Sequence, residues 1–119
     1  MGNPVVHFEI AVRNDTQARE FYAQLFGWKI TVDENFNYGA VDTGGEGGIN
    51  GGISRAEEDK FPPYVTIYVQ VDDLQATLDH AGRLGGKTIL PPIPIPGIGA
   101  AAMFSDPDGN IIGLFKPEN

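Results

Sequence analysis

The chain contains no cysteine, only two histidines and few basic residues. Its 119 residues include 8 Lys and Arg against 16 Asp and Glu, so the formal net charge is −8. Without cysteine there can be no disulfide framework, no thiolate metal site and no thiol nucleophile. An acidic chain without a basic run also argues against nucleic acid and anionic membranes as partners. The acidity is typical of a soluble protein.

Long apolar runs are missing as well. No stretch approaches the roughly 20 apolar residues that a membrane-spanning helix needs. The start, Met1-Gly-Asn-Pro, lacks the charged segment and apolar run of a secretory signal. We therefore expect a soluble protein located in the cytoplasm. The length fits a single domain, residues 1–119.

An internal repeat organises the chain. A shift of 59 residues lays residues 4–30 over residues 63–89 without a gap, and six of the 27 positions are identical, including Pro4/Pro63 and Gly27/Gly86. Average residue usage would give about one or two identities. We therefore predict two modules, residues 4–54 and 63–117, joined by a linker at residues 55–62.

The first module reads as β-α-β-β-β. In Val5–Val12 apolar residues alternate with others, which predicts a strand with one apolar face and with His7 and Glu9 on the other face. A helix is predicted over Thr16–Phe26 and ends at Gly27. Three strands should follow, at Trp28–Val32, Tyr38–Asp42 and Ile49–Ser54. The run Gly44–Gly48 is interpreted as a hairpin connection, because no helix and no phosphate-loop lysine follow it.

The second module repeats this order. Val65, Ile67, Val69 and Val71 should form the apolar face of its first strand, and a helix is predicted over Leu74–Leu84. A short strand at Lys87–Leu90 should give way to a proline-stiffened rim at residues 91–97. Ala100–Phe104 and Asn110–Phe115 should form a hairpin around Ser105–Gly109. That turn has Asp and Asn at alternate positions, but its glycine and final residue do not match a calcium loop, so we interpret it as a plain turn.

These features resemble the vicinal oxygen chelate superfamily, which includes glyoxalase I, bleomycin-resistance proteins and extradiol dioxygenases. The resemblance rests on two β-α-β-β-β modules, on Phe21-Tyr22 followed by Leu25-Phe26-Gly27-Trp28, and on Phe104-Ser-Asp-Pro-Asp-Gly-Asn before the last strand. It covers nearly the whole chain and is strongest for short glyoxalase-related bacterial proteins. It implies an α+β fold in which two tandem βαβββ modules form cupped mixed sheets with helices on the outer face. It also implies a small-molecule ligand and a homodimer.

The resemblance further implies where a metal would be held. Enzymes of the superfamily usually bind a divalent cation through four side chains, one from the first and one from the last strand of each half, with His or Gln on the first strands and Glu on the last. The matching positions here are His7, Gly52, Thr66 and Gly113. Since an imidazole and a hydroxyl are too few donors for zinc, nickel or iron, no cofactor is expected. Glu9 beside His7 leaves a zinc, nickel or iron site as the alternative.

Strand alternation predicts the other residues that line the cup. Glycines at two of the implied ligand positions leave room for a small molecule. The alternative is a small hydrated groove in which His7 is satisfied by a neighbour such as Tyr68 or Thr66. The expected ligand-binding residues are Asn50, Gly52, Thr66, Tyr68, Gln70, Gly113 and Phe115.

Catalysis is left open by the sequence. If the chain is an enzyme, His7 and Glu9 are the candidates for proton transfer, because a carboxylate on the same strand face would raise the pKa of the imidazole. Trp28 and Tyr38 are expected in the core or at its rim; the alternative is that either ring closes over a flat aromatic ligand. We consider three functions: metal-free binding of a hydrophobic or aromatic metabolite, a metal-dependent lyase or dioxygenase of the glyoxalase type, and a non-catalytic dimeric module.

Overall fold

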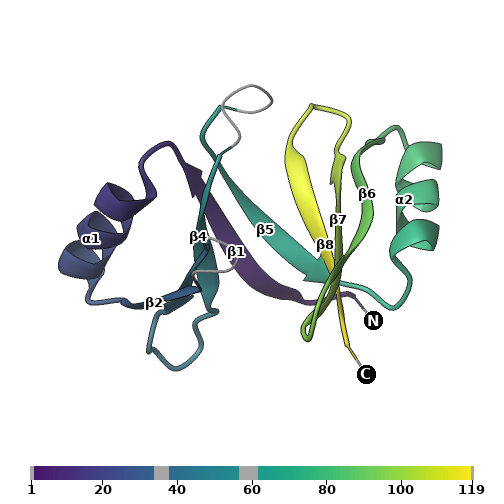
Figure 1. Ribbon diagram of the computed structural model, residues 1–119. Coiled ribbons are helices and arrows are strands. Elements are labelled where there is room, and N and C mark those ends of the chain that lie inside the picture. Colours follow the sequence, from purple (N-terminus) through teal and green to yellow (C-terminus); the bar gives the residue numbers. More distant parts are fainter. Residues whose placement is uncertain (1, 34–37, 57–61, 119) are drawn as a thin grey trace. The chain divides into compact units, whose positions relative to one another are not determined.

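The computed structural model describes residues 2–33, 38–56 and 62–118 (Figure 1). These residues form the β-α-β-β-β order twice, so the predicted α+β fold class and the mixed sheet are confirmed. The elements are β1 (Val5–Val12), α1 (Asp15–Phe26), β2 (Lys29–Asp33), β3 (Tyr38–Asp42), β4 (Gly51–Arg55), β5 (Tyr64–Gln70), α2 (Leu74–Arg83), β6 (Lys87–Ile95), β7 (Gly99–Ser105) and β8 (Ile111–Pro117).

The backbone divides into two compact units. One comprises His7–Thr66, here called the first-half unit; the other comprises the residues up to Val6 together with those from Ile67 onward, here called the second-half unit. The N-terminal segment belongs to the second-half unit, where the amide of Gln70 donates to the carbonyl of Pro4 over 2.9 Å. Of the predicted linker 55–62, Arg55 lies in β4 and residues 57–61 are outside the described residues.

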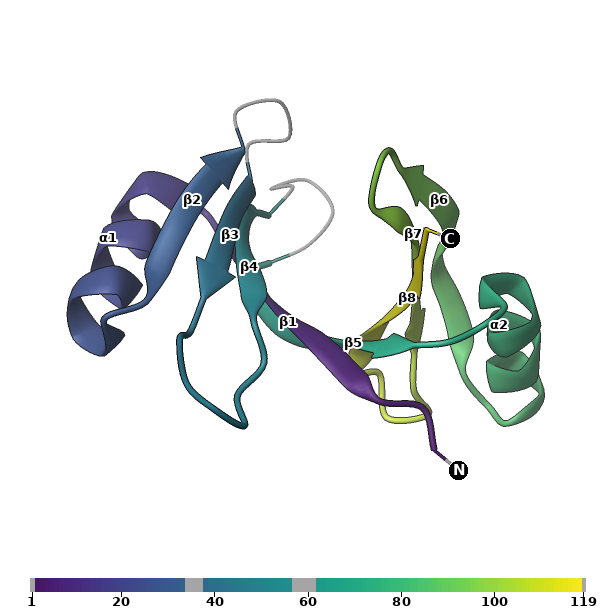
Figure 2. The same cartoon turned by 90° about the horizontal axis from the view of Figure 1, so that it is seen from below.

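The first-half unit is a four-stranded sheet with α1 on one face (Figure 2). Its strand order is β2-β3-β4-β1, and only the β1–β4 pair among these strands is parallel. The apolar residues of each strand lie toward the helix, as alternation requires. Their core consists of Ile10, Val41 and Ile53, with Phe8, Val12, Ala18, Tyr22, Trp28 and Ile30 packed around it.

Helix α1 begins and ends where the sequence predicts. The Asn14 side chain accepts a hydrogen bond from the Gln17 amide over 3.0 Å, and Gly27 ends the helix with φ of 72°, a left-handed conformation that favours glycine. The apolar residues of the helix divide between two environments. Ala18 and Tyr22 pack on the core, whereas Phe21 and Leu25 remain 57% and 58% exposed.

The second-half unit repeats this layout with the order β5-β8-β7-β6 and α2 on one face. Asp73 caps the helix by accepting from the Ala76 amide over 2.9 Å. The core beneath α2 consists of Val71, Leu74, Leu78, Ala102 and Leu114.

The predicted proline-stiffened rim is largely a continuation of strand β6. β6 continues through Pro91, Pro92 and Pro94 to Ile95, five residues beyond the predicted end at Leu90. The extension is possible because β6 is an edge strand, where a proline without an N–H leaves no ladder bond unmade. The register between β6 and β7 shifts twice along this stretch.

The predicted apolar face of β5 is wrong in its first half. Val65 and Ile67 are 69% and 37% exposed, whereas Thr66 between them is buried. Helix α2 packs mainly against β6, β7 and β8, so its core reaches only Val69 and Val71. Alternation predicted which residues share a face, but not how far the helix covers that face.

The turn between β7 and β8 is built by one carboxylate. Asp106 accepts hydrogen bonds from the amides of Asp108 and Asn110 and from the Asn110 side chain, each between 2.8 and 2.9 Å. These hydrogen bonds hold the pKa of Asp106 below its ordinary value. The interpretation of this segment as a plain turn is therefore confirmed.

Within the described part of the chain, neither helix has the length and hydrophobicity that a membrane crossing requires. The predicted cytoplasmic location stays a prediction.

Two glycines of the second-half unit should respond to alanine in opposite ways. A Cβ at Gly82 in α2 would meet no atom, whereas a Cβ at Gly113 would overlap the ring of Tyr68. Gly82→Ala should therefore raise the free energy of unfolding by up to about 1 kcal/mol, and Gly113→Ala should lower it by about 1–3 kcal/mol. Urea unfolding of both variants measures this. Equal effects of the two substitutions would contradict the packing described here.

Candidate functional site

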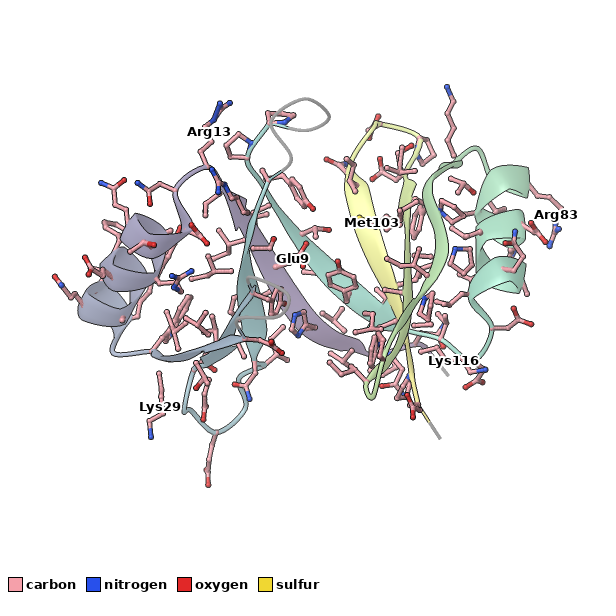
Figure 3. The ribbon with its side chains drawn as sticks, viewed as in Figure 1. Glu9, Arg13, Lys29, Arg83, Met103 and Lys116 are labelled. Carbon is pink, nitrogen blue, oxygen red and sulfur yellow. The ribbon has the colours of Figure 1, made fainter. Side chains whose placement is uncertain are left out.

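One face of the first-half sheet gathers polar and titratable side chains. It is the face opposite α1, and Figure 3 shows Glu9 pointing away from that helix. In the parallel β1–β4 pair Glu9 lies directly beside Gly52, and in the antiparallel β3–β4 pair Ala40 lies on the other side of Gly52. Because alternate residues share a face, His7 and Tyr38 belong to the same surface. We call this surface the polar face; its residues are His7, Glu9, Tyr38, Ala40, Gly52 and Tyr64.

The closest contact on the polar face joins His7 and Tyr38. Their Nε2 and Oη atoms are 2.6 Å apart, a short hydrogen bond. The Tyr38 phenol also covers Gly52, since a Cβ built there would overlap its hydroxyl. A glycine at position 52 is therefore required by the tyrosine that lies over it. The pair links β1 to β3 across β4. The expectation that Gly52 and Gly113 leave room for a small molecule is wrong, because tyrosine rings occupy the space above both glycines.

A second pair lies beside the first. The Tyr64 hydroxyl donates to the Glu9 carboxylate over 3.3 Å. Glu9 and Tyr64 both act electrostatically on Tyr38, which places the two pairs within one cluster. The polar face therefore combines an imidazole, a carboxylate and two phenols.

The environment keeps both members of the His7–Tyr38 pair uncharged. Burial lowers the pKa of His7 from its ordinary 6.5, because loss of solvent disfavours the charged imidazole. The prediction that the pKa of His7 is raised is therefore wrong. Burial, and then the charges of Glu9 and Tyr64, raise the pKa of Tyr38 well above its ordinary value. At neutral pH the pair is thus a neutral imidazole and a protonated phenol.

In the second-half unit, too, a tyrosine ring covers a glycine of the sheet, but its neighbours are mostly apolar. Tyr68 lies directly beside Gly113 in the parallel β5–β8 pair, and its ring covers that glycine. Gln70 and Phe115 are the next pair on this face. Met103, directly beside Gly113 in β7, is buried. Where the first half carries titratable groups, the second half is largely apolar.

Two predicted ligand-binding residues have structural contacts. Asn50 precedes β4, and its side-chain oxygen accepts from the Thr43 amide over 3.1 Å, which closes the glycine-rich connection. Thr66 is 4% exposed in β5. Whether these and the other predicted residues contact a ligand stays a prediction.

Sequence reasoning missed the two tyrosines of the polar face. Tyr38 was expected in the core or at its rim, whereas the structure places it against His7. The signal was present in the alternation of Tyr38 with Ala40, opposite the buried Val41. The Tyr64 contact had no such signal, because it depends on where β5 begins. A contact of His7 with Tyr68 or Thr66 stays a prediction.

The chain matches the model of a known protein family. The Glyoxalase/Bleomycin resistance protein/Dioxygenase superfamily model matches residues 5–114. The chain belongs to this superfamily. A glyoxylase-like domain-containing protein from Didymella fabae is 31% identical over 86% of this chain and 84% of its own length.

Two further superfamily likenesses are more distant. The anthracycline biosynthesis protein DnrV from Streptomyces peucetius is 25% identical over 92% of this chain and 45% of its own length, so the chain spans about half of that relative. The structure of methylmalonyl-CoA epimerase from Mycobacterium tuberculosis matches with a TM-score of 0.65 at 18% identity, covering 97% of this chain and 88% of that one. The second likeness shows the shared fold.

The polar face does not fit the cation site expected for a metal enzyme of the superfamily. Nε2 of His7 is engaged by Tyr38, and Gly52 offers no donor where a carboxylate would be expected. No group of three or more His, Cys, Asp or Glu side chains suited to a metal occurs in residues 2–33, 38–56 and 62–118. These side chains are too few for the three or more protein ligands of zinc. The expectation of no cofactor stays a prediction.

The lowered pKa of His7 should make stability depend on pH. Because the unfolded imidazole takes up a proton before the folded one does, the free energy of unfolding should fall as pH decreases below 6.5 and level off below the folded pKa. His7→Gln should remove this part of the dependence. Urea unfolding between about pH 5 and pH 8 measures it, and NMR titration of the imidazole protons gives the folded pKa directly. A folded pKa above 6.5 would contradict burial as the dominant cause.

Proposed function

We propose that the chain binds a flat aromatic small molecule on the polar face without a bound metal ion. One observation carries the proposal: the Tyr38 phenol covers Gly52 and is hydrogen-bonded to His7. An organic group thus stands where the superfamily resemblance implies a cation and its carboxylate ligand. Metal-free binding of an aromatic metabolite is therefore favoured over a metal-dependent enzyme and over a non-catalytic dimeric module.

The composition of the polar face supports an aromatic ligand. Tyrosine rings offer flat apolar surface together with a polar tip, which suits ligands that are both planar and oxygenated. Ala40, beside Gly52 in β3, carries only a methyl group, so the ring of Tyr38 stays accessible on that side. Polar groups at fixed positions orient a ligand in a small-molecule site.

The relatives support the same ligand class. DnrV is named for anthracycline biosynthesis, and anthracyclines are polycyclic, oxygenated and planar. Since this chain spans about half of that relative, the likeness supports a class of ligand rather than a reaction. Membership in the superfamily is compatible with an aromatic ligand.

Metal-dependent lyase or dioxygenase chemistry has less support from the residues. It would need donors besides His7 and Glu9, and the polar face offers phenols in their place. If a reaction occurs, the neutral imidazole of His7 is the group best suited to accept a proton. Whether the chain is an enzyme stays open.

Homodimer formation is part of the proposal. The exposed side chains of Val65 and Ile67 in β5 provide apolar surface of the kind that protein interfaces cover. Many oligomers of this size are twofold-symmetric dimers.

The test uses anthraquinone-2-sulfonate, a soluble, planar and oxygenated probe. Protein dialysed against a chelator should contain no stoichiometric metal by elemental analysis. It should still bind the probe saturably by isothermal titration calorimetry, because no cation takes part in the contact. Probe affinity should be the same before and after the chelator treatment. Stoichiometric zinc, nickel or iron that is needed for binding would contradict the proposal.

A matched pair of variants locates the binding surface. Ala40→Arg places a long side chain beside Gly52 on the polar face, and should weaken probe binding by about tenfold or more, that is about 1.4 kcal/mol. Gln24→Arg places the same side chain on the exposed surface of α1, away from the polar face, and should leave affinity unchanged. Equal affinities of the two variants would place the binding site elsewhere.

A further inference from the structure

We propose that Tyr38 replaces the metal ion in this chain: its hydroxyl holds an oxygen atom of the ligand, and its ring keeps a divalent cation from binding beside His7. The inference rests on the proposed function for its first part. Its second part concerns the polar face alone and can be tested without a ligand. The expected ligand is a planar aromatic compound that carries a carbonyl oxygen.

The position of Tyr38 supports both parts. Its hydroxyl is 2.6 Å from Nε2 of His7, and its ring occupies the space above Gly52. A cation bound by His7 would have to displace this hydroxyl. A carboxylate at position 52 would have to displace the ring. The two obstacles belong to one side chain, so one substitution should remove both.

Which group donates in the His7–Tyr38 hydrogen bond depends on the imidazole tautomer. In the tautomer that the proposal takes, the proton is on Nε2: His7 then donates to the phenol oxygen, and the phenol O–H is left for the ligand. The Glu9 carboxylate accepts from Tyr64. A hydrogen bond donated by one group strengthens the next bond in the chain.

A hydrogen bond from the Tyr38 hydroxyl would favour ligands that carry a carbonyl oxygen. A bound cation attracts a ligand carbonyl by charge, and a polarised phenol attracts it by a hydrogen bond. A quinone oxygen accepts such a bond, whereas an aromatic hydrocarbon of the same shape cannot. Discrimination between the two is therefore the signature of Tyr38 acting on the ligand.

The ligand experiment compares anthraquinone-2-sulfonate with anthracene-2-sulfonate, which lacks both carbonyl oxygens. The full chain should bind the quinone roughly three- to tenfold more tightly, the range of one net hydrogen bond. Tyr38→Phe keeps the ring over Gly52 and removes the hydroxyl. It should reduce quinone affinity to that of the hydrocarbon and leave hydrocarbon affinity unchanged.

The outcomes separate this inference from the proposed function. If both probes bind equally, or if Tyr38→Phe weakens both alike, aromatic binding stands and the role of Tyr38 is overturned. If neither probe binds the full chain, the proposed function fails together with the ligand part of the inference. The cation experiment then decides the second part by itself.

The cation experiment tests whether a zinc site forms when the Tyr38 ring is removed and a carboxylate is added at position 52. Because Glu9 lies directly beside position 52 in the β1–β4 pair, the double variant Tyr38→Ala, Gly52→Glu brings two carboxylates and the His7 imidazole to one surface. Three protein ligands of the N and O types that bind zinc are the number found in catalytic zinc sites. The double variant should take up one equivalent of zinc by equilibrium dialysis. Removing His7 from it by His7→Ala should weaken zinc binding by about tenfold or more.

Folding is checked by circular dichroism, and Tyr38→Ala, Gly52→Asp provides a shorter carboxylate if the first variant does not fold. Tyr38→Phe is the matched control, since its ring remains above Gly52 and no donor is added. It should bind no zinc. A folded double variant without zinc binding would overturn cation exclusion by Tyr38. Stoichiometric zinc in the unmodified chain that is lost on His7→Ala would overturn it as well.

Discussion

The hydrogen bond between His7 and Tyr38 is the interaction on which the account of this protein depends. It requires the tyrosine to cross β4 at the level of Gly52, and this crossing is possible only where β4 has no side chain. Because any Cβ at position 52 would overlap the phenol, the glycine and the tyrosine are mutually dependent. The Tyr38 phenol engages Nε2 of His7 and fills the space above Gly52, and thereby places a phenol where the superfamily resemblance implies a cation.

The two halves of the chain share one packing feature, although their tyrosines come from strands that are not equivalent in the repeat, β3 and β5. Each half covers a glycine of its last strand with a tyrosine, Tyr38 over Gly52 and Tyr68 over Gly113. An aromatic ring lying on a glycine of a neighbouring strand also stabilises the sheet, because it restores the apolar contact that the missing side chain cannot make. In the first half this ring meets His7, and Glu9 and Tyr64 lie in the same cluster. In the second half the neighbours include Met103 and Phe115.

The elements of the fold were predictable because they depend on local signals. Asn14 and Gly27 mark the ends of α1, and β3 begins and ends at the residues that its alternation predicts. The exposure of Val65 was not predictable, since it depends on how far α2 extends over its sheet. The prolines exclude a central strand, as predicted, but they do not end β6 at Leu90, because an edge strand tolerates residues that a central strand does not.

The site was predicted only in part for a related reason. Alternation placed His7 and Glu9 on one face, and the repeat drew attention to Gly52. The partner of His7 depends on the register between β3 and β4, and the predicted start of β4 at Ile49 differs from the observed start at Gly51. Tyr38 also reaches Gly52 diagonally, since Ala40 is the residue directly beside that glycine. Diagonal contacts require both the register and the side-chain direction, and a single sequence provides neither.

The most direct measurement is a crystal structure of the protein grown with zinc in the medium and soaked with anthraquinone-2-sulfonate. The account predicts a quinone oxygen within hydrogen-bonding distance of the Tyr38 hydroxyl, the His7–Tyr38 bond intact, and no anomalous zinc signal at His7. A zinc ion bound to Nε2 of His7, with the Tyr38 ring turned away from Gly52, would contradict it.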